Sequence, residues 1–203
     1  MELKSNYLNR AVEQMASLPG IGRKTALRLV LQLQRRTKEE ISAFASSFLE
    51  MSEHLKSCKS CGNISDNDTC EICLNESRDR KLICVVEDIR DVMAIESTAT
   101  FKGVYHVLGG IISPMDGIGP SDLNISSLVD KISLGGIHEV VFALSPTMEG
   151  DTTSFYLHKK LKFFPIQITT ITRGVSVGTE LQYADELSLG RSILYRQPFH
   201  LSD

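Results

Sequence analysis

Four cysteines stand in two closely spaced pairs, Cys58-x₂-Cys61 and Cys70-x₂-Cys73, with eight residues between the pairs. Each x₂ spacing lets two thiolates reach one tetrahedral ion, and zinc is the usual occupant of such a site. Two disulfides are the alternative, but the sequence reads as cytosolic, where thiols stay reduced. Because protein side chains would fill all four positions, we predict a structural zinc ion with no open position for catalysis.

A second constellation is the stretch LPGIGRKTALRLVL, residues 18–31, in which two glycines precede three cations. Glycines at positions 20 and 22 let backbone N–H groups approach an oxygen atom without a Cβ in the way. Those N–H groups would lie at the start of a helix, where the helix dipole also favours an anion. Lys24 and Arg28 share one helical face and can hold neighbouring phosphates.

These residues predict a helix-hairpin-helix that binds the DNA backbone. The alternatives are a helical hairpin without a ligand and a turn that packs between subunits. A module of this kind contacts phosphates rather than bases, so its affinity should fall steeply with salt. The predicted DNA contacts are Gly20, Ile21, Gly22, Arg23, Lys24 and Arg28.

Carboxylates form a third group. Glu87-Asp88 directly follows the apolar run 82–86, and Glu149-x-Asp151 follows the run 139–144 after a short loop. If both runs are parallel strands, these acids lie at the carboxyl ends of the strands, where ligands normally bind. Clustered acids there could coordinate Mg²⁺ for phosphoryl chemistry. Surface acids and contacts for a basic protein partner are the alternatives.

Helical elements are expected around the Gly20–Gly22 bend and after it. Apolar residues recur at helical spacing over 8–18 and resume over 26–34. Thr37 and Glu40 have the spacing of a capping box that starts a third helix. The expected buried stripe of that helix is Ile41, Phe44, Ala45, Phe48 and Leu55.

The pattern changes after residue 81, where short apolar runs alternate with helical segments. This alternation predicts a mostly parallel sheet flanked by helices. Cys84 is expected to be a plain core residue of the first strand, and the Gly- and Pro-rich stretch 109–122 a long loop. The predicted strands are 82–86, 104–108, 139–144 and 166–172, and the predicted helices among them are 88–97 and one through 154–162.

Charge is unevenly distributed in this chain of 203 residues with a net charge of −3. Between Lys4 and Lys38 the sequence contains eight Lys and Arg residues and one acid. From Leu82 onward it contains nine Lys and Arg residues and fourteen acids. The electrostatic signature of a nucleic-acid partner is thus confined to the first forty residues, where a solvated charged face is the alternative. No run of 18 apolar residues and no signal peptide is visible, so we expect a globular cytoplasmic protein without a membrane partner.

The order of these motifs resembles the RecR family of bacterial recombination mediators over nearly the whole chain. The resemblance rests on the hairpin, the four cysteines, the strand ending in Glu-Asp, the Gly/Pro loop, SPTMEGD and TRGVSVGTELQYADE. It implies a mixed α and β fold of four parts. These are a helix-hairpin-helix region at 1–56, a Cys₄ zinc finger at 57–79, an α/β Toprim domain with a parallel-rich sheet at 80–172, and a helical or extended C-terminal segment with subunit contacts at 173–203.

The resemblance also implies a non-catalytic, nucleoid-associated role in DNA repair. Family members form dimers or tetramers that clamp DNA, and they work with RecO, and in many bacteria with RecF, to load RecA on single-stranded DNA at gaps. By position, Lys24 and Arg28 match the family's DNA contacts, and the four cysteines match its zinc ligands. Glu87 matches the Toprim glutamate. Glu149-Gly150-Asp151 stands where Asp-x-Asp is usual, and the matched acids would bind Mg²⁺ or a partner such as RecO.

Two other functions stay open on the sequence. A Mg²⁺-dependent Toprim nuclease or strand-transfer enzyme would use the acids, and a zinc-stabilised adaptor would bind only proteins. The C-terminal glycines Gly174 and Gly178 are not followed by Gly-Lys-Ser/Thr, so they do not predict a P-loop. Packing or subunit contact is the expected role of Leu181, Tyr183 and Leu187.

Overall fold

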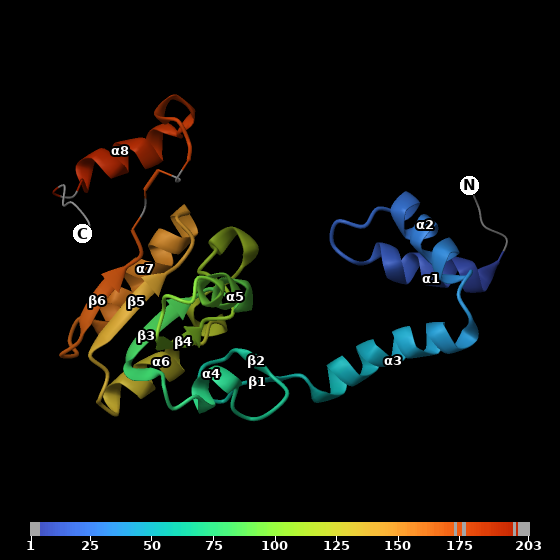
Figure 1. Ribbon diagram of the computed structural model, residues 1–203, viewed down its shortest axis with the longest axis horizontal. Coiled ribbons are helices and arrows are strands. Elements are labelled where there is room, and N and C mark those ends of the chain that lie inside the picture. The colour runs from blue at the N-terminus through green and yellow to red at the C-terminus, as the bar shows by residue number, and fades with distance from the viewer. Residues whose placement is uncertain (1–4, 173, 176–177, 197, 199–203) are drawn as a thin grey trace. The chain divides into compact units, whose positions relative to one another are not determined.

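The computed structural model describes residues 5–172, 174–175, 178–196 and 198 (Figure 1). It divides into two compact units, Met1–Leu55 and Lys56–Asp203. The predicted mixed fold is confirmed, because the chain combines a helical hairpin, a four-cysteine cluster and a parallel sheet.

The first unit contains the predicted helical hairpin, α1 (Asn6–Ala16) and α2 (Arg23–Leu33). The two helices pack on a small core in which Val12 and Ala26 are fully buried and Val30 nearly so. The Ser5 hydroxyl caps α1 by accepting from the N–H of Leu8 at 3.4 Å. The apolar core between α1 and α2 holds the two helices together on either side of the glycine bend.

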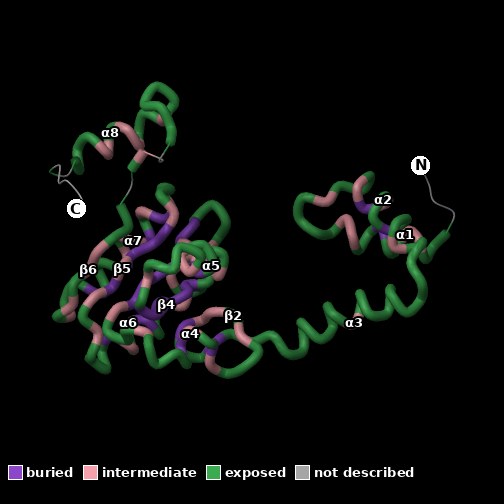
Figure 2. The backbone as a smooth tube through the Cα atoms, in the orientation of Figure 1, coloured by how far each residue is buried: buried purple, intermediate pink, exposed green. Residues whose placement is uncertain are grey.

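The third helix, α3 (Lys38–His54), begins as predicted but is not buried. The capping box is present, since Thr37 N donates to Glu40 Oε2 at 2.8 Å and Glu40 N donates to Thr37 Oγ1 at 3.3 Å. No residue of α3 is buried, and Figure 2 shows exposed backbone along almost its whole length. Helical spacing identifies an apolar face without showing that the same chain covers it. The expected burial of Ile41, Phe44, Ala45, Phe48 and Leu55 is therefore wrong.

The second unit starts with a small knuckle. Strands β1 (Lys56–Ser57) and β2 (Ile64–Ser65) pair antiparallel, and the short helix α4 (Glu71–Leu74) follows. The buried residues of the knuckle are its four cysteines, with Ile72 packed against them. So small an apolar core cannot hold the segment by burial alone.

A four-stranded parallel sheet forms the body of this unit (Figure 1). Its order is β4-β3-β5-β6, so the central β3 pairs with strands on both sides, and Ile83 lies opposite Val104 and Val140. The predicted alternation of strands and helices is confirmed. The strands are β3 (Asp79–Val86), β4 (Gly103–Val107), β5 (Glu139–Ala143) and β6 (Gln167–Thr170), and the helices are α5 (Ile89–Ser97), α6 (Ile125–Ser133) and α7 (Met148–Leu161).

Helices cover both faces of the sheet, as the continuous apolar strands require. Helices α6 and α7 pack on one face through Leu128, Ile132, Leu157 and Leu161. Helix α5 packs on the other through Val92, beside the predicted core residue Cys84. The loop before α6 contains two 3₁₀ turns, Pro114–Asp116 and Pro120–Asp122.

The turn after α5 contains a strained alanine. Ala99 has φ +54°, and its N–H donates to Glu96 O at 2.9 Å, an arrangement that closes the helix. Because a Cβ disfavours the left-handed region, we expect Ala99→Gly to raise the free energy of unfolding by about 1 kcal/mol. Urea unfolding measures this change. The matched control is Ala94→Gly inside the same helix, which should lower stability by about 1 kcal/mol; a shared sign would contradict the prediction.

A histidine is buried in the sheet, which no spacing in the sequence indicated. His106 on β4 is 0 % exposed, and its Nε2–H donates to Asn124 O at 2.7 Å. Its Nδ1 is buried and has no partner among the described residues. Desolvation lowers the pKa of His106 to about 4, with a smaller contribution from the nearby Lys131.

This depressed pKa makes stability depend on pH in a defined window. In the unfolded chain this side chain is protonated below about pH 6.5, whereas in the folded chain it is protonated only below about pH 4. Stability should therefore fall as the pH falls through this window, by about 3 kcal/mol in all. His106→Gln should flatten the slope of unfolding free energy against pH, while His158→Gln, at an exposed position, should keep it. Parallel slopes in all three proteins would contradict this assignment.

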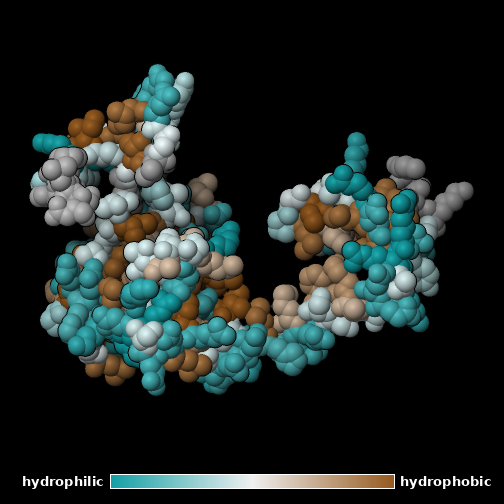
Figure 3. All heavy atoms as spheres, in the orientation of Figure 1, coloured by the Kyte–Doolittle hydropathy of each residue, from teal (hydrophilic) through white to brown (hydrophobic). Residues whose placement is uncertain are grey.

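The C-terminal segment contains the 3₁₀ turn η3 (Leu181–Tyr183) and helix α8 (Glu186–Leu194). Leu181, Tyr183 and Leu187 are exposed, so none of them is a core residue of the described part of the chain. Figure 3 shows apolar atoms gathered on this segment. Among the described helices, none combines the length and the apolar character needed to cross a membrane.

Candidate functional site

The bend between α1 and α2 has the geometry of an anion-binding turn. Gly20 has φ +79°, and Gly22 serves as the N-cap of α2 without a side chain to cap it. The first N–H bonded within α2 is that of Ala26, which donates to Gly22 O at 2.9 Å. The N–H groups of residues 23–25, in the first turn of α2, are thus available to an outside acceptor. The N–H of Ile21 is not, because it donates to Leu18 O at 3.1 Å.

Cations lie beside these N–H groups. Lys24 and Arg28 line one groove of about 320 Å³ along α2, and Arg23 is exposed at the first position of the helix. Within the described residues, none of the three pairs with a carboxylate. Arg35 lines the same groove and was missed in the sequence, although its spacing of seven from Arg28 places it on that face. The arrangement can hold successive phosphates of a polynucleotide.

The four cysteines come together in the second unit. Their sulfur atoms all lie within 4.8 Å of one another, and Cys61 Sγ lies 3.6 Å from Cys70 Sγ. All four side chains are buried. Hydrogen bonding with Cys61 lowers the pKa of Cys73, whereas the same hydrogen bond together with burial raises the pKa of Cys61, so in the metal-free cluster these two sulfurs share a proton that a metal ion would displace. Four buried sulfurs at this separation fit a tetrahedral zinc ion.

The knuckle is bonded to the sheet as well as to itself. Val107 N donates to Cys61 O at 2.7 Å, and Arg80 Nη2 donates to Cys73 O at 2.9 Å. Gly62 has φ +77°, and a Cβ there would lie 2.9 Å from Val107 O. The four-cysteine loop therefore lies directly against the carboxyl end of β4.

The predicted acids lie at the carboxyl ends of β3 and β5. Glu87 follows β3 and lies 3.4 Å from Ser145 Oγ, which follows β5. Glu149 and Asp151 occupy the first turn of α7. Asp88 caps α5 by accepting from the N–H of Arg90 at 2.7 Å. The pairing of strand ends that the sequence predicted is thus present.

These acids do not converge on one cation. The Arg90 guanidinium pairs with Asp88 and lowers the pKa of that carboxyl group. Arg191 of α8 lies 3.5 Å from Asp151. In the described part of the chain, only the cysteines form a group of three or more side chains whose ligand atoms lie within 4.8 Å. The carboxylates therefore present a charged surface that basic groups can reach.

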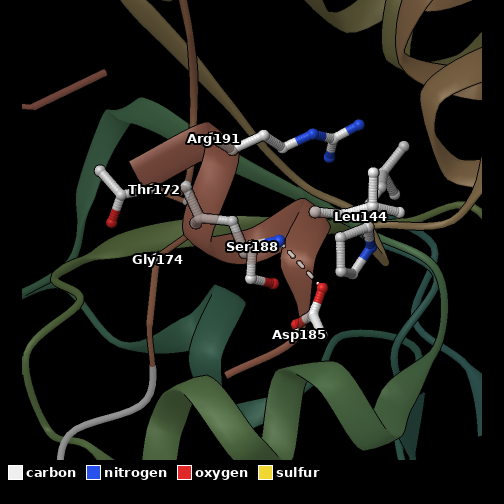
Figure 4. A pocket seen from close by; sticks show the side chains of 9 residues that line it. Leu144, Thr172, Gly174, Asp185, Ser188 and Arg191 are labelled. Carbon is white, nitrogen blue, oxygen red and sulfur yellow. Dashed lines mark hydrogen bonds between the residues drawn. The ribbon is translucent and has the colours of Figure 1, made fainter. Parts of the chain in front are cut away.

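A cavity of about 460 Å³ lies between the strand ends and the C-terminal segment (Figure 4). Asp185 on its wall accepts from the N–H of Ser188 at 2.9 Å and so caps α8. Among the described residues that line it there is no lysine, so this lining does not have the P-loop pattern of a phosphate site. Its lining is Leu144, Pro146, Ile171, Thr172, Gly174, Asp185, Leu187, Ser188 and Arg191.

Four family models match this chain. The RecR helix-hairpin-helix matches residues 8–51, and the RecR Cys₄-zinc finger domain matches residues 55–75. The Toprim domain matches residues 81–172, and the RecR C-terminal model matches residues 174–197.

Relatives align over nearly the whole chain. Recombination protein RecR of Flavobacterium johnsoniae is 58 % identical over 199 residues, which are 98 % of this chain and 97 % of the relative. The protein of the same name from Flavobacterium psychrophilum is 58 % identical over 100 % of this chain and 98 % of its own. That of Bacteroides thetaiotaomicron is 57 % identical over 96 % and 95 %.

Proposed function

The chain belongs to the RecR family of recombination proteins, and from this membership we propose that it is an oligomeric DNA clamp that mediates recombination without turnover. The observation that carries the proposal is the bend at Gly20–Gly22. It presents uncapped N–H groups at the start of α2, with Lys24 and Arg28 beside them and no described carboxylate to neutralise them. The ligand is the DNA backbone.

Within this proposal each part of the chain has a role. The bend residues Gly20, Ile21 and Gly22, together with Arg23, Lys24 and Arg28, contact DNA, although Ile21 does so without its N–H, which donates to Leu18 O. Cys58, Cys61, Cys70 and Cys73 hold the zinc ion. The four parts are the predicted ones, at 1–56, 57–79, 80–172 and 173–203. The exposed apolar residues of the last part contact other subunits, and the protein works in the cytoplasm at the nucleoid.

Assembly follows from the small size of the hairpin. One bend offers few phosphate contacts, so a single copy should bind weakly. Several copies around one duplex raise the affinity through effective concentration. A dimer or tetramer of this chain that encircles DNA therefore suits the site better than a monomer does.

We further propose that the acidic surface at Glu87, Asp88, Glu149 and Asp151 meets a basic partner protein. In this role it receives RecO, with RecF in some bacteria, so that RecA is loaded on single strands at gaps. The pairing of Asp88 with Arg90 and of Asp151 with Arg191 shows that guanidinium groups can reach these acids, and this supports a basic partner rather than one shared Mg²⁺ ion. Nicking of plasmid DNA that disappears in Glu87→Gln would overturn the non-catalytic assignment.

Sedimentation of the purified protein with a gapped duplex tests the proposal. We expect the protein to sediment as an oligomer, to shift to a larger complex with the DNA, and to lose the complex when salt rises from about 50 to 200 mM, because released counterions drive backbone binding. A complex that persists unchanged at the higher salt, or that a monomer forms equally well, would contradict it.

A further inference from the structure

The second half of α7 and the turn that follows it form a basic and aromatic stripe. Positions 155, 158 and 159 share one face of α7 by helical spacing, and the chain continues in the same sense through the αR C-cap at 162 to position 163. The opposite face is the buried one, where Leu157 and Leu161 are fully covered by the sheet. We call this outer face the α7 stripe; its members are Phe155, His158, Lys159, Lys162 and Phe163.

Large apolar rings on this stripe are exposed without cover. Phe155 is 64 % exposed and Phe163 is 83 % exposed. Each has a lysine over its ring, since Lys159 Nζ lies 5.3 Å from the Phe155 centroid and Lys162 Nζ lies 4.8 Å from the Phe163 centroid. The lysine occupies one side of each ring, and so much exposed area leaves ring surface open to a ligand.

The charge of this segment is opposite to that of its surroundings. No acid occurs between Thr152 and Thr179, although acids outnumber bases from Leu82 onward. In the described part of the unit, neither Lys159 nor Lys162 pairs with a carboxylate. Lysines near a helix C-terminus can complement the dipole, but that effect explains neither exposed phenylalanine. The unpaired lysines favour an anionic ligand, and the exposed rings favour one with planar groups.

We propose that the α7 stripe is a second nucleic-acid contact, which binds single-stranded DNA by stacking unpaired bases on Phe155 and Phe163 and by pairing phosphates with Lys159 and Lys162. Bases of a duplex are already stacked on one another, whereas unpaired bases are free to stack on aromatic side chains. An acidic peptide without aromatic side chains, such as polyglutamate, would pair with the lysines but would place no aromatic ring on either phenylalanine. This contact goes beyond the proposed hairpin site and depends on different residues.

Binding of the full-length protein to a labelled oligothymidine of about 30 nucleotides tests the proposal, with a duplex of equal length beside it. Phe155→Ala with Phe163→Ala should weaken single-strand binding by about tenfold or more, because both rings on which bases stack are removed, and should leave duplex binding within about twofold. In the same variant, fluorescence quenching of 2-aminopurine in the strand, which reports stacking, should diminish. Lys159→Ala with Lys162→Ala should reduce the single-strand salt slope by about 1.4.

Met115→Ala with Leu134→Ala is the matched control, because it removes two apolar side chains that are also highly exposed; it should bind as the unaltered protein does. Equal weakening on single strands and duplex in the aromatic variant would overturn the proposal. So would normal DNA binding by both stripe variants together with lost binding of polyglutamate, which would make the stripe a peptide site. The hairpin variant Lys24→Glu with Arg28→Glu, measured in parallel, distinguishes the two sites. Normal DNA binding by the hairpin variant would contradict only the proposed function. Normal single-strand binding by the stripe variants would contradict only this inference.

Discussion

Reversal of both hairpin charges, Lys24→Glu with Arg28→Glu, is expected to weaken duplex binding by at least about a hundredfold at low salt. Two phosphate contacts are lost, and two carboxylates now face the strand beside the uncapped N–H groups of α2. Because an oligomer carries the change in every copy, the loss multiplies through the assembly. Fluorescence anisotropy with a labelled duplex over a salt series measures both the affinity and its salt slope.

The hairpin should stay folded in this variant, since both side chains point away from the core of Val12, Ala26 and Val30. Circular dichroism and zinc content should therefore match those of the unaltered protein. Glu13→Gln changes the charge of α1 at another exposed position and serves as the control, with no loss of affinity expected. Binding by the double variant that equals the control would remove the hairpin as the DNA contact.

Loss of zinc is expected to have the largest effect on stability. Cys61→Ser should abolish stoichiometric zinc and destabilise the knuckle severely, because structural zinc contributes roughly 10–16 kcal/mol of apparent binding free energy in zinc-finger peptides. The effect should reach the sheet, since Val107 and Arg80 bond to carbonyl groups of the four-cysteine loop. Metal analysis gives the stoichiometry, and hydrogen exchange follows the amides of β4.

The fifth cysteine provides the control for this prediction. Cys84 is buried on β3, away from the cluster, and burial raises the pKa of its thiol to about 12. Cys84→Ala should lower stability modestly through lost packing and should keep one zinc per chain. A zinc content that falls equally in both variants, or an unchanged β4 in zinc-free Cys61→Ser, would contradict the role assigned to the knuckle.

Local chemistry explains which features could be predicted from the sequence. The bend is encoded by Gly20 and Gly22, the metal cluster by x₂ spacings, and the sheet by apolar runs such as 82–86. Each of these signals depends on near neighbours in the chain. The apolar residues Ile125, Leu128 and Ile132 of α6 have the same kind of local helical spacing, although this helix is not among those predicted above.

Features that depend on distant residues could not be predicted. The burial of His106 is set by Asn124 and by helices packed across the sheet, and no spacing encodes it. The contact between Arg191 and Asp151 joins residues forty positions apart. The predicted burial of the apolar face of α3 was wrong for a related reason. Its helical periodicity is correct, but no described part of the chain covers that face.

That uncovered helix has a thermodynamic consequence. A helix of 17 residues gains little from propensity alone, so α3 depends on its capping box and on any surface that shields its phenylalanines. Whatever covers Phe44 and Phe48 would contribute the free energy that orders the backbone beneath them. Removal of such a cover and unfolding of α3 would then be coupled, so that loss of the covering surface would be measured as a loss of helix content.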